Sequence, residues 1–106
     1  MKMTMAAVLS LALLSLGARA QVDKATERTF KSKCASCHGA DGKAETDQAK
    51  KMGVKPFSAA ASKSDADLKK AIEDGAKSDK GEMEGYKDKL SGEQIDALVK
   101  YVRALK

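Results

Sequence analysis

The amino-acid sequence predicts an all-α fold, and three observations carry this prediction. The C-terminal residues 91–106 place apolar side chains along one helix face, at Ile95, Leu98, Val99, Val102 and Leu105. Two earlier segments, residues 23–33 and 64–74, each begin with a side chain that caps helices, and the second ends before Gly75. No segment shows the apolar–polar alternation that is typical of a half-buried strand.

The first predicted helix covers residues 23–33. Its N-terminal Asp23 is a residue type that accepts hydrogen bonds from the free N–H groups of a first helical turn. Four residues follow the four-residue spacing of one helix face: Val22, Thr26, Phe30 and Cys34. The two glycines at positions 39 and 42 then indicate a loop.

The middle of the chain, residues 39–63, carries weaker signals. A short helix over residues 45–52 is predicted, because Gly53 follows it as a helix stop. Residues 54–57 are expected to be extended, since the residue before Pro56 is disfavoured in a helix.

The rest of the chain is predicted as two helices joined by a loop. The helix over residues 64–74 begins at the cap Ser64 and is stopped by the glycine at position 75. Residues 76–90 are expected to be a loop. Ser91 and Gln94 have the spacing of a capping box and open the last helix.

The most specific motif is Cys34-Ala35-Ser36-Cys37-His38, the Cys-x-x-Cys-His signature of c-type haem attachment. Two thiols three residues apart can form thioethers with the vinyl groups on one edge of a porphyrin. His38 follows four positions after Cys34, on the same side of a helical turn, so its imidazole can reach the iron. The motif predicts one covalently attached haem c with His38 as the proximal iron ligand.

Other interpretations of the two cysteines have less support. A zinc site needs four good ligands, and the chain has only two cysteines and one histidine. A thioredoxin-like redox pair is expected in a βαβ pattern, and no strand pattern lies near the motif. A disulfide between residues three apart would close a very small loop and stabilise the chain little.

Residues 1–20 read as a signal peptide, which predicts export to the periplasm. Lys2 is followed by an apolar stretch, residues 5–16, and by Ala18-Arg19-Ala20, which fits a cleavage site. The alternative is an uncleaved membrane anchor, but the stretch is shorter than the roughly 20 residues that span a bilayer. The expected mature protein, residues 21–106, is one domain with no stable membrane insertion.

Charge and composition narrow the classes of partner. The formal net charge of +5 falls by two when Lys2 and Arg19 leave with the signal peptide, and no basic arm is interleaved with aromatics. Nucleic acid is therefore not an expected partner.

Residues 21–106 contain no Trp and four other aromatics, Phe30, Phe57, Tyr86 and Tyr101. So small a chain builds a weak core alone, and a buried porphyrin would supply the missing apolar surface.

Taken in order, these residues resemble the small class I bacterial cytochromes c. The resemblance rests on residues 30–39 with the haem motif, on Gly81-Glu82-Met83, and on residues 86–103, which lead into the last helix. It implies about three to five helices around one covalent haem, with the N- and C-terminal helices crossing. By resemblance, Phe30 and Tyr101 form the aromatic pair at the crossing; ordinary core aromatics would be buried in the same way.

The sixth iron ligand has two methionine candidates in residues 21–106. The resemblance places Met83 at the family's ligand position, in a loop flanked by glycines. A thioether ligand favours ferrous iron and raises the reduction potential. Met52 is interpreted as filling a gap in the core. An open site, Met52 or a lysine remain alternatives to Met83.

Two further residues are singled out around the ligands. Glu84 stands where family members often carry proline, which would stiffen the loop; a carboxylate there would also favour ferric iron. The resemblance makes Pro56 the candidate for a backbone carbonyl that accepts the second N–H of His38. The alternative for Pro56 is a simple loop proline.

The expected function is one-electron transfer between redox proteins, with no catalytic residues and no enzymatic activity. A monomer is expected. Acidic partners could dock on lysines near the haem segments, although acidic residues interleave with them: Lys31, Lys33, Lys43, Lys80, Lys87 and Lys89. The alternatives are a ligand sensor or weak peroxidase with a displaceable sixth ligand, and a haem-free thiol oxidoreductase.

Overall fold

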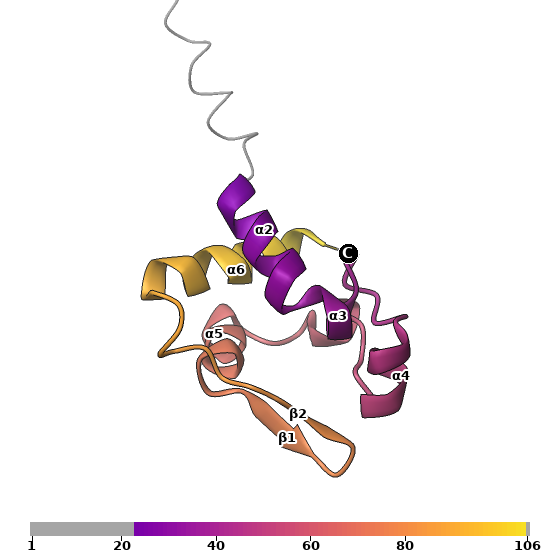
Figure 1. The fold of residues 1–106 in the computed structure, drawn as a ribbon. Helices are drawn as coiled ribbons and strands as arrows, with labels where there is room; N and C mark the ends of the chain where they lie inside the picture. The colour runs from indigo at the N-terminus through magenta and orange to yellow at the C-terminus, as the bar shows by residue number, and fades with distance from the viewer. Residues whose placement is uncertain (1–22, 106) are drawn as a thin grey trace, which may run out of the picture.

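The computed structural model describes residues 23–105, so the predicted signal peptide lies outside the described part of the chain. The elements in chain order are α2 (Lys24–Lys33), α3 (Ala35–His38), α4 (Asp47–Met52), the 3₁₀ helix η1 (Phe57–Ala60), α5 (Asp65–Asp74), β1 (Ala76–Ser78), β2 (Gly81–Met83) and α6 (Gly92–Ala104). The predicted all-α class is confirmed in that helices dominate the fold, to which one short β-hairpin is added (Figure 1). Within residues 23–105, no helix has both the length and the apolar character needed to cross a membrane.

The predicted caps open the helices. Asp23 accepts a hydrogen bond from the Ala25 N–H at the start of α2. Ser64 caps α5 in the same way. Ser91 and Gln94 form both halves of the capping box at the start of α6. These side chains satisfy backbone N–H groups that have no partner within the helix, which is why the helices begin where the sequence predicts.

The N- and C-terminal helices cross, as Figure 1 shows for α2 and α6. Phe30 of α2 is completely buried at this crossing, and its ring centroid lies 4.9 Å from that of Tyr101 on α6. Ile95 and Leu98 of α6 are, with Phe30, the largest fully buried side chains, and Tyr86 and Leu90 complete this core. The apolar stripe of α6 therefore covers α2, as its spacing predicts.

Residues 76–90 differ from the predicted loop, because their first part forms a hairpin. β1 and β2 pair antiparallel with Ala76 opposite Met83 and Ser78 opposite Gly81. Each strand has only three residues, and all of β1 is exposed. So short a strand with no buried face shows no alternation, which explains why the sequence gives no signal for it.

The base of the hairpin requires glycine on both sides. At Gly75, φ is +79°, and a Cβ atom there would lie 2.2 Å from the carbonyl oxygen of Met83. A Cβ atom at Gly85 would lie 2.5 Å from the carbonyl oxygen of Glu73. The chain can therefore cross itself here only without side chains. The close approach fixes where β2 ends, and with it the position of Met83.

Candidate functional site

The Cys-x-x-Cys-His motif occupies a single helical turn at the end of α2 and in α3. Cys34 joins the two helices: its N–H donates to the Phe30 carbonyl at 2.8 Å. The Cys34 carbonyl accepts the His38 N–H at 2.9 Å. Cys34 and Cys37 are both free cysteines, so neither thiol is tied up in a disulfide. The fold thus presents two thiols and one imidazole from one short segment.

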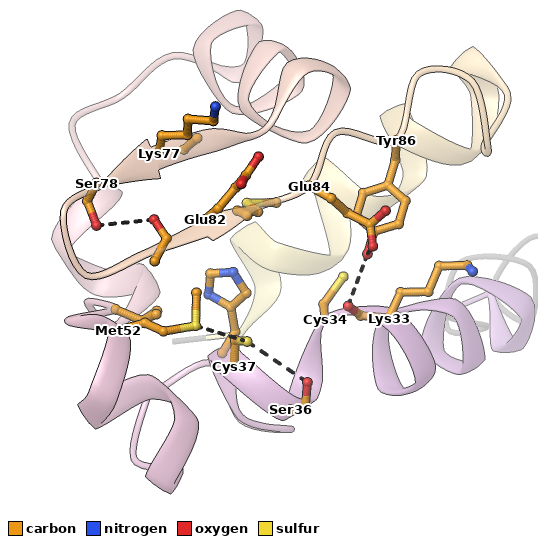
Figure 2. A pocket seen from close by; sticks show the side chains of 15 residues that line it. Lys33, Cys34, Ser36, Cys37, Met52, Lys77, Ser78, Glu82, Glu84 and Tyr86 are labelled. Atoms are coloured by element: carbon orange, nitrogen blue, oxygen red, sulfur yellow. Dashed lines mark hydrogen bonds between the residues drawn. The ribbon is translucent and has the colours of Figure 1, made fainter.

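Two cavities meet at this segment, and both are lined by Cys34, His38 and Met83. The first, of about 440 Å³, extends over Cys37 and the hairpin. Figure 2 shows Cys34 and Cys37 on one side of it and Glu82 of β2 on the other. The second, of about 300 Å³, is lined almost wholly by apolar side chains of α2, η1, α5 and α6. Both volumes are in the range of cofactor sites.

His38 is held without a hydrogen bond to its ring. Its Nδ1 atom is buried and has no hydrogen-bond partner among the described residues. Burial lowers the pKa of His38, which favours the neutral imidazole that binds metal ions. The ring stacks on Phe57 with centroids 4.8 Å apart. A half-buried imidazole with an unpartnered Nδ1, beside two free thiols and an apolar cavity, fits a covalently attached haem.

Pro56 lies beside this site but makes a different contact. It lines the second cavity with His38. Its carbonyl accepts the N–H of Ala59 at 2.9 Å, within the turn of η1. A hydrogen bond between this carbonyl and the His38 ring therefore stays a prediction.

The two candidate methionines lie at different places. Met83, at the end of β2, lines both cavities together with His38. Met52, at the end of α4, lines only the first, and its Sδ lies 4.0 Å from the Sγ of Cys37. Its Sδ also accepts a hydrogen bond from the Gln48 amide at 3.3 Å. Met52 thus borders the site instead of filling a remote core gap, a position that its sequence context does not signal.

Glu84 and its neighbours form a polar cluster beside Met83. Its carboxylate is paired with Lys89. The Tyr86 hydroxyl lies 3.4 Å from one Glu84 oxygen and 3.4 Å from the Lys33 carbonyl of α2 (Figure 2). The hydrogen bond from Lys89 lowers the pKa of Glu84. Because the negative charge of Glu84 is offset by Lys89, its effect on the iron is expected to be reduced.

The geometry weakens two of the alternatives to haem. Burial raises the pKa of Cys34, whereas the reactive cysteine of a thiol oxidoreductase has a lowered pKa. Within residues 23–105, the structure contains no cluster of three or more His, Cys, Asp or Glu side chains that could hold a metal ion. This excludes a protein-only zinc site from the described part of the chain.

Comparison with known proteins agrees with this site. Residues 21–102 match the family described as cytochrome c oxidase, cbb3-type, subunit III. A solved structure named KustC0563 c-type cytochrome is 30% identical, with a TM-score of 0.66; the match covers 76% of this chain and 96% of that one. A point mutant of the same protein gives 31% identity and a TM-score of 0.64, over 76% and 98% of the two chains. No curated protein gives a significant match.

Proposed function

The chain belongs to this family of c-type cytochrome domains, which carry covalently attached haem c and serve in electron transfer, and we propose that it is a periplasmic one-electron carrier. One observation carries the proposal. His38 on α3 and Met83 on β2 come from different elements but line the same two cavities. His38 and Met83 would together hold one haem iron in this arrangement.

Each residue of the site has an expected role. Cys34 and Cys37 form the two thioethers, His38 binds the iron through its neutral imidazole, and Met83 supplies a thioether sulfur that favours the ferrous state. Bound haem supplies an iron that alternates between the ferric and ferrous states. With His38 and Met83 both holding the iron, the protein would transfer electrons without binding a substrate at the metal.

The helices make one side of the site apolar. Apolar side chains of α2, α5 and α6 line the second cavity, among them Phe30, Ile72 and Leu98. A low-dielectric lining disfavours charge and limits the solvent reorganisation that accompanies a change in charge. The first cavity instead reaches the polar rim beside Cys37 and the hairpin. Electrons are therefore proposed to enter and leave on the Cys37 side.

The structure narrows the lysines proposed for docking. Lys31, Lys87 and Lys89 each pair with a carboxylate of this chain. None of the remaining three forms an ion pair within residues 23–105; Lys43 does not line the first cavity, whereas Lys33 lines it and Lys80 lies in the hairpin turn. We expect these two to attract an acidic redox partner to the Cys37 side, with an association rate that falls as salt rises.

One observation supports a second candidate function, that of a ligand sensor or weak peroxidase. Met83 lies on a two-stranded hairpin whose first strand is fully exposed, and a ligand held in this way is easier to displace than one on a packed helix. Displacement would open the iron to a small molecule, as in a sensor or a weak peroxidase.

The absorption spectrum separates the two functions. It is recorded for the purified, periplasmically matured protein, oxidised and reduced, with and without carbon monoxide. An electron carrier gives a low-spin c-type spectrum with the weak far-red sulfur–iron band and no response to carbon monoxide. A high-spin spectrum that shifts with carbon monoxide would favour the sensor or peroxidase.

A further inference from the structure

The imidazole of His38 is the end of a chain of four aromatic rings. Its centroid lies 4.8 Å from the Phe57 ring, with an interplanar angle of 28°. Phe57 in turn lies 6.0 Å from Phe30 in an edge-to-face contact, and Phe30 lies 4.9 Å from Tyr101. The ring of His38 is thereby connected through Phe57 to the buried crossing of α2 and α6.

Phe57 itself is held on several sides. It is the first residue of η1, and its N–H donates to the Gly42 carbonyl at 2.9 Å. A Cβ atom at Gly42 would lie 2.5 Å from the Phe57 Cδ2 atom, so the ring packs directly on the backbone of a glycine at φ +75°. The turn after α3 that contains Gly42 is closed by the Ala44 N–H, which donates to the His38 carbonyl at 2.9 Å. The phenyl ring is therefore held on the sides that face Gly42 and His38, while another side lines the second cavity.

A metal-bound histidine is usually oriented by a hydrogen bond from its other ring nitrogen. Among the described residues, the Nδ1 of His38 has no such partner, and the imidazole ring stacks on the face of Phe57. Stacked aromatic rings resist rotation because their contact area and quadrupoles favour one offset arrangement. The stack can thus fix the plane of the imidazole where a hydrogen bond does so in other sites.

We propose that Phe57 is a positioning residue that sets the orientation of the His38 ring about its bond to the iron. This inference rests on the proposed function, since it takes His38 to be the iron ligand. The plane of an axial imidazole determines how unpaired spin is distributed over the porphyrin of a low-spin ferric haem. A change at Phe57 should therefore alter that distribution without removing the haem or its ligands.

The test compares two ring truncations in the ferric holoprotein. Phe57→Leu removes the ring that contacts His38, and Tyr101→Leu removes a ring two steps further along the same chain. We expect both variants to unfold at lower temperature than the unchanged protein. Only Phe57→Leu should change the paramagnetic shifts of the haem methyl groups in the proton NMR spectrum. Identical methyl shifts in Phe57→Leu and the unchanged protein would overturn the proposal.

A measurement on the unchanged protein covers the case in which Phe57→Leu does not mature. In the diamagnetic ferrous state, nuclear Overhauser contacts are expected between the ring protons of Phe57 and those of His38. Their absence from a complete ring-proton assignment would overturn the proposal. Loss of the proposed function is distinguishable, because a protein without a low-spin, covalently bound haem shows neither shifted methyl groups nor a c-type spectrum.

Discussion

The two proposed iron ligands are held by regions of very different construction. His38 ends a helical turn, and its ring rests on aromatic side chains that lead to the fully buried Phe30. Met83 ends a three-residue strand whose partner strand is exposed. Local stability follows buried contacts, so the region around His38 should open only on global unfolding and the hairpin well before it. One iron would thus join a well-packed region and a region with one exposed strand.

The hairpin has little buried surface, but close backbone contacts and a polar cluster hold its base. Gly75 and Gly85 let the two sides of its base approach closely. The Tyr86 N–H donates to the Ile72 carbonyl of α5 at 2.8 Å. The Tyr86 side chain reaches Glu84 and the end of α2. The residue types at the base of the hairpin, Gly75, Gly85 and Tyr86, should therefore decide how firmly Met83 is held.

The largest effect on stability is expected on the His38 side, from Phe30→Ala. Truncating a fully buried Phe costs about 3–5 kcal/mol. The free energy of unfolding, measured by denaturant titration of the holoprotein, should fall by this amount. Phe30→Leu should cost less, because it keeps most of the apolar volume. A loss below about 1 kcal/mol for Phe30→Ala would contradict the placement of this ring at the centre of the core.

Met83→Ala should abolish the far-red sulfur–iron band and make the reduced protein bind carbon monoxide, while the helical circular dichroism is retained. The iron loses a ligand, but the core on the His38 side contains no part of that side chain. Met52→Ala is the matched control, because Met52 lines only the first cavity. If Met52→Ala, and not Met83→Ala, removed the band, the assignment of the sixth ligand would be wrong.

Gly75→Ala should weaken the Met83 side alone. The added Cβ atom meets the Met83 carbonyl at 2.2 Å, and φ is +79°, so strain of about 1–3 kcal/mol is expected. In a denaturant titration, the midpoint for loss of the far-red band should fall clearly, whereas the midpoint for loss of the helical circular dichroism should change less. Gly92→Ala is the control, because a Cβ atom at Gly92 has nothing within 4 Å. Equal effects of the two substitutions would show that the crossing at Gly75 does not position Met83.

The smallest effect is expected from Glu84→Gln, and it should depend on pH. Lys89 lowers the pKa of Glu84 in the folded protein. The pair therefore stabilises the fold fully at pH values above 4.5, the ordinary pKa of a Glu side chain. This stabilisation is lost as the pH falls through the lowered pKa. At pH 7, the far-red band of Glu84→Gln should therefore disappear at a slightly lower denaturant concentration than the band of the unchanged protein. In acid, below the lowered pKa, the two bands should disappear at the same denaturant concentration. Glu82→Gln, on the same hairpin, should show no such difference.

The sequence predicts the His38 side better than the Met83 side, for physical reasons. The caps at Asp23, Ser64 and Ser91 act locally, and the motif around His38 lies within one helical turn, so short-range patterns suffice. The hairpin is fixed by an approach between Gly75 and Met83 that only the folded chain brings about.

The stack of Phe57 on His38 and the position of Met52 beside Cys37 also depend on contacts between separate segments. A single sequence identifies Phe57 as an aromatic residue and Met52 as a methionine before a glycine, and neither pattern specifies a neighbour. Gly42 offers the one local hint, since a glycine in a loop that follows a helix often accommodates a close contact.

The contrast between the two ligand regions is tested most directly by one denaturant titration of the holoprotein. The far-red sulfur–iron band reports the Met83 bond, and far-ultraviolet circular dichroism reports the helices. We predict that the band disappears at a clearly lower denaturant concentration than the helical signal, because the hairpin opens before the core of α2 and α6. Coincident loss of the two signals, or the absence of the band from the native protein, would contradict the account.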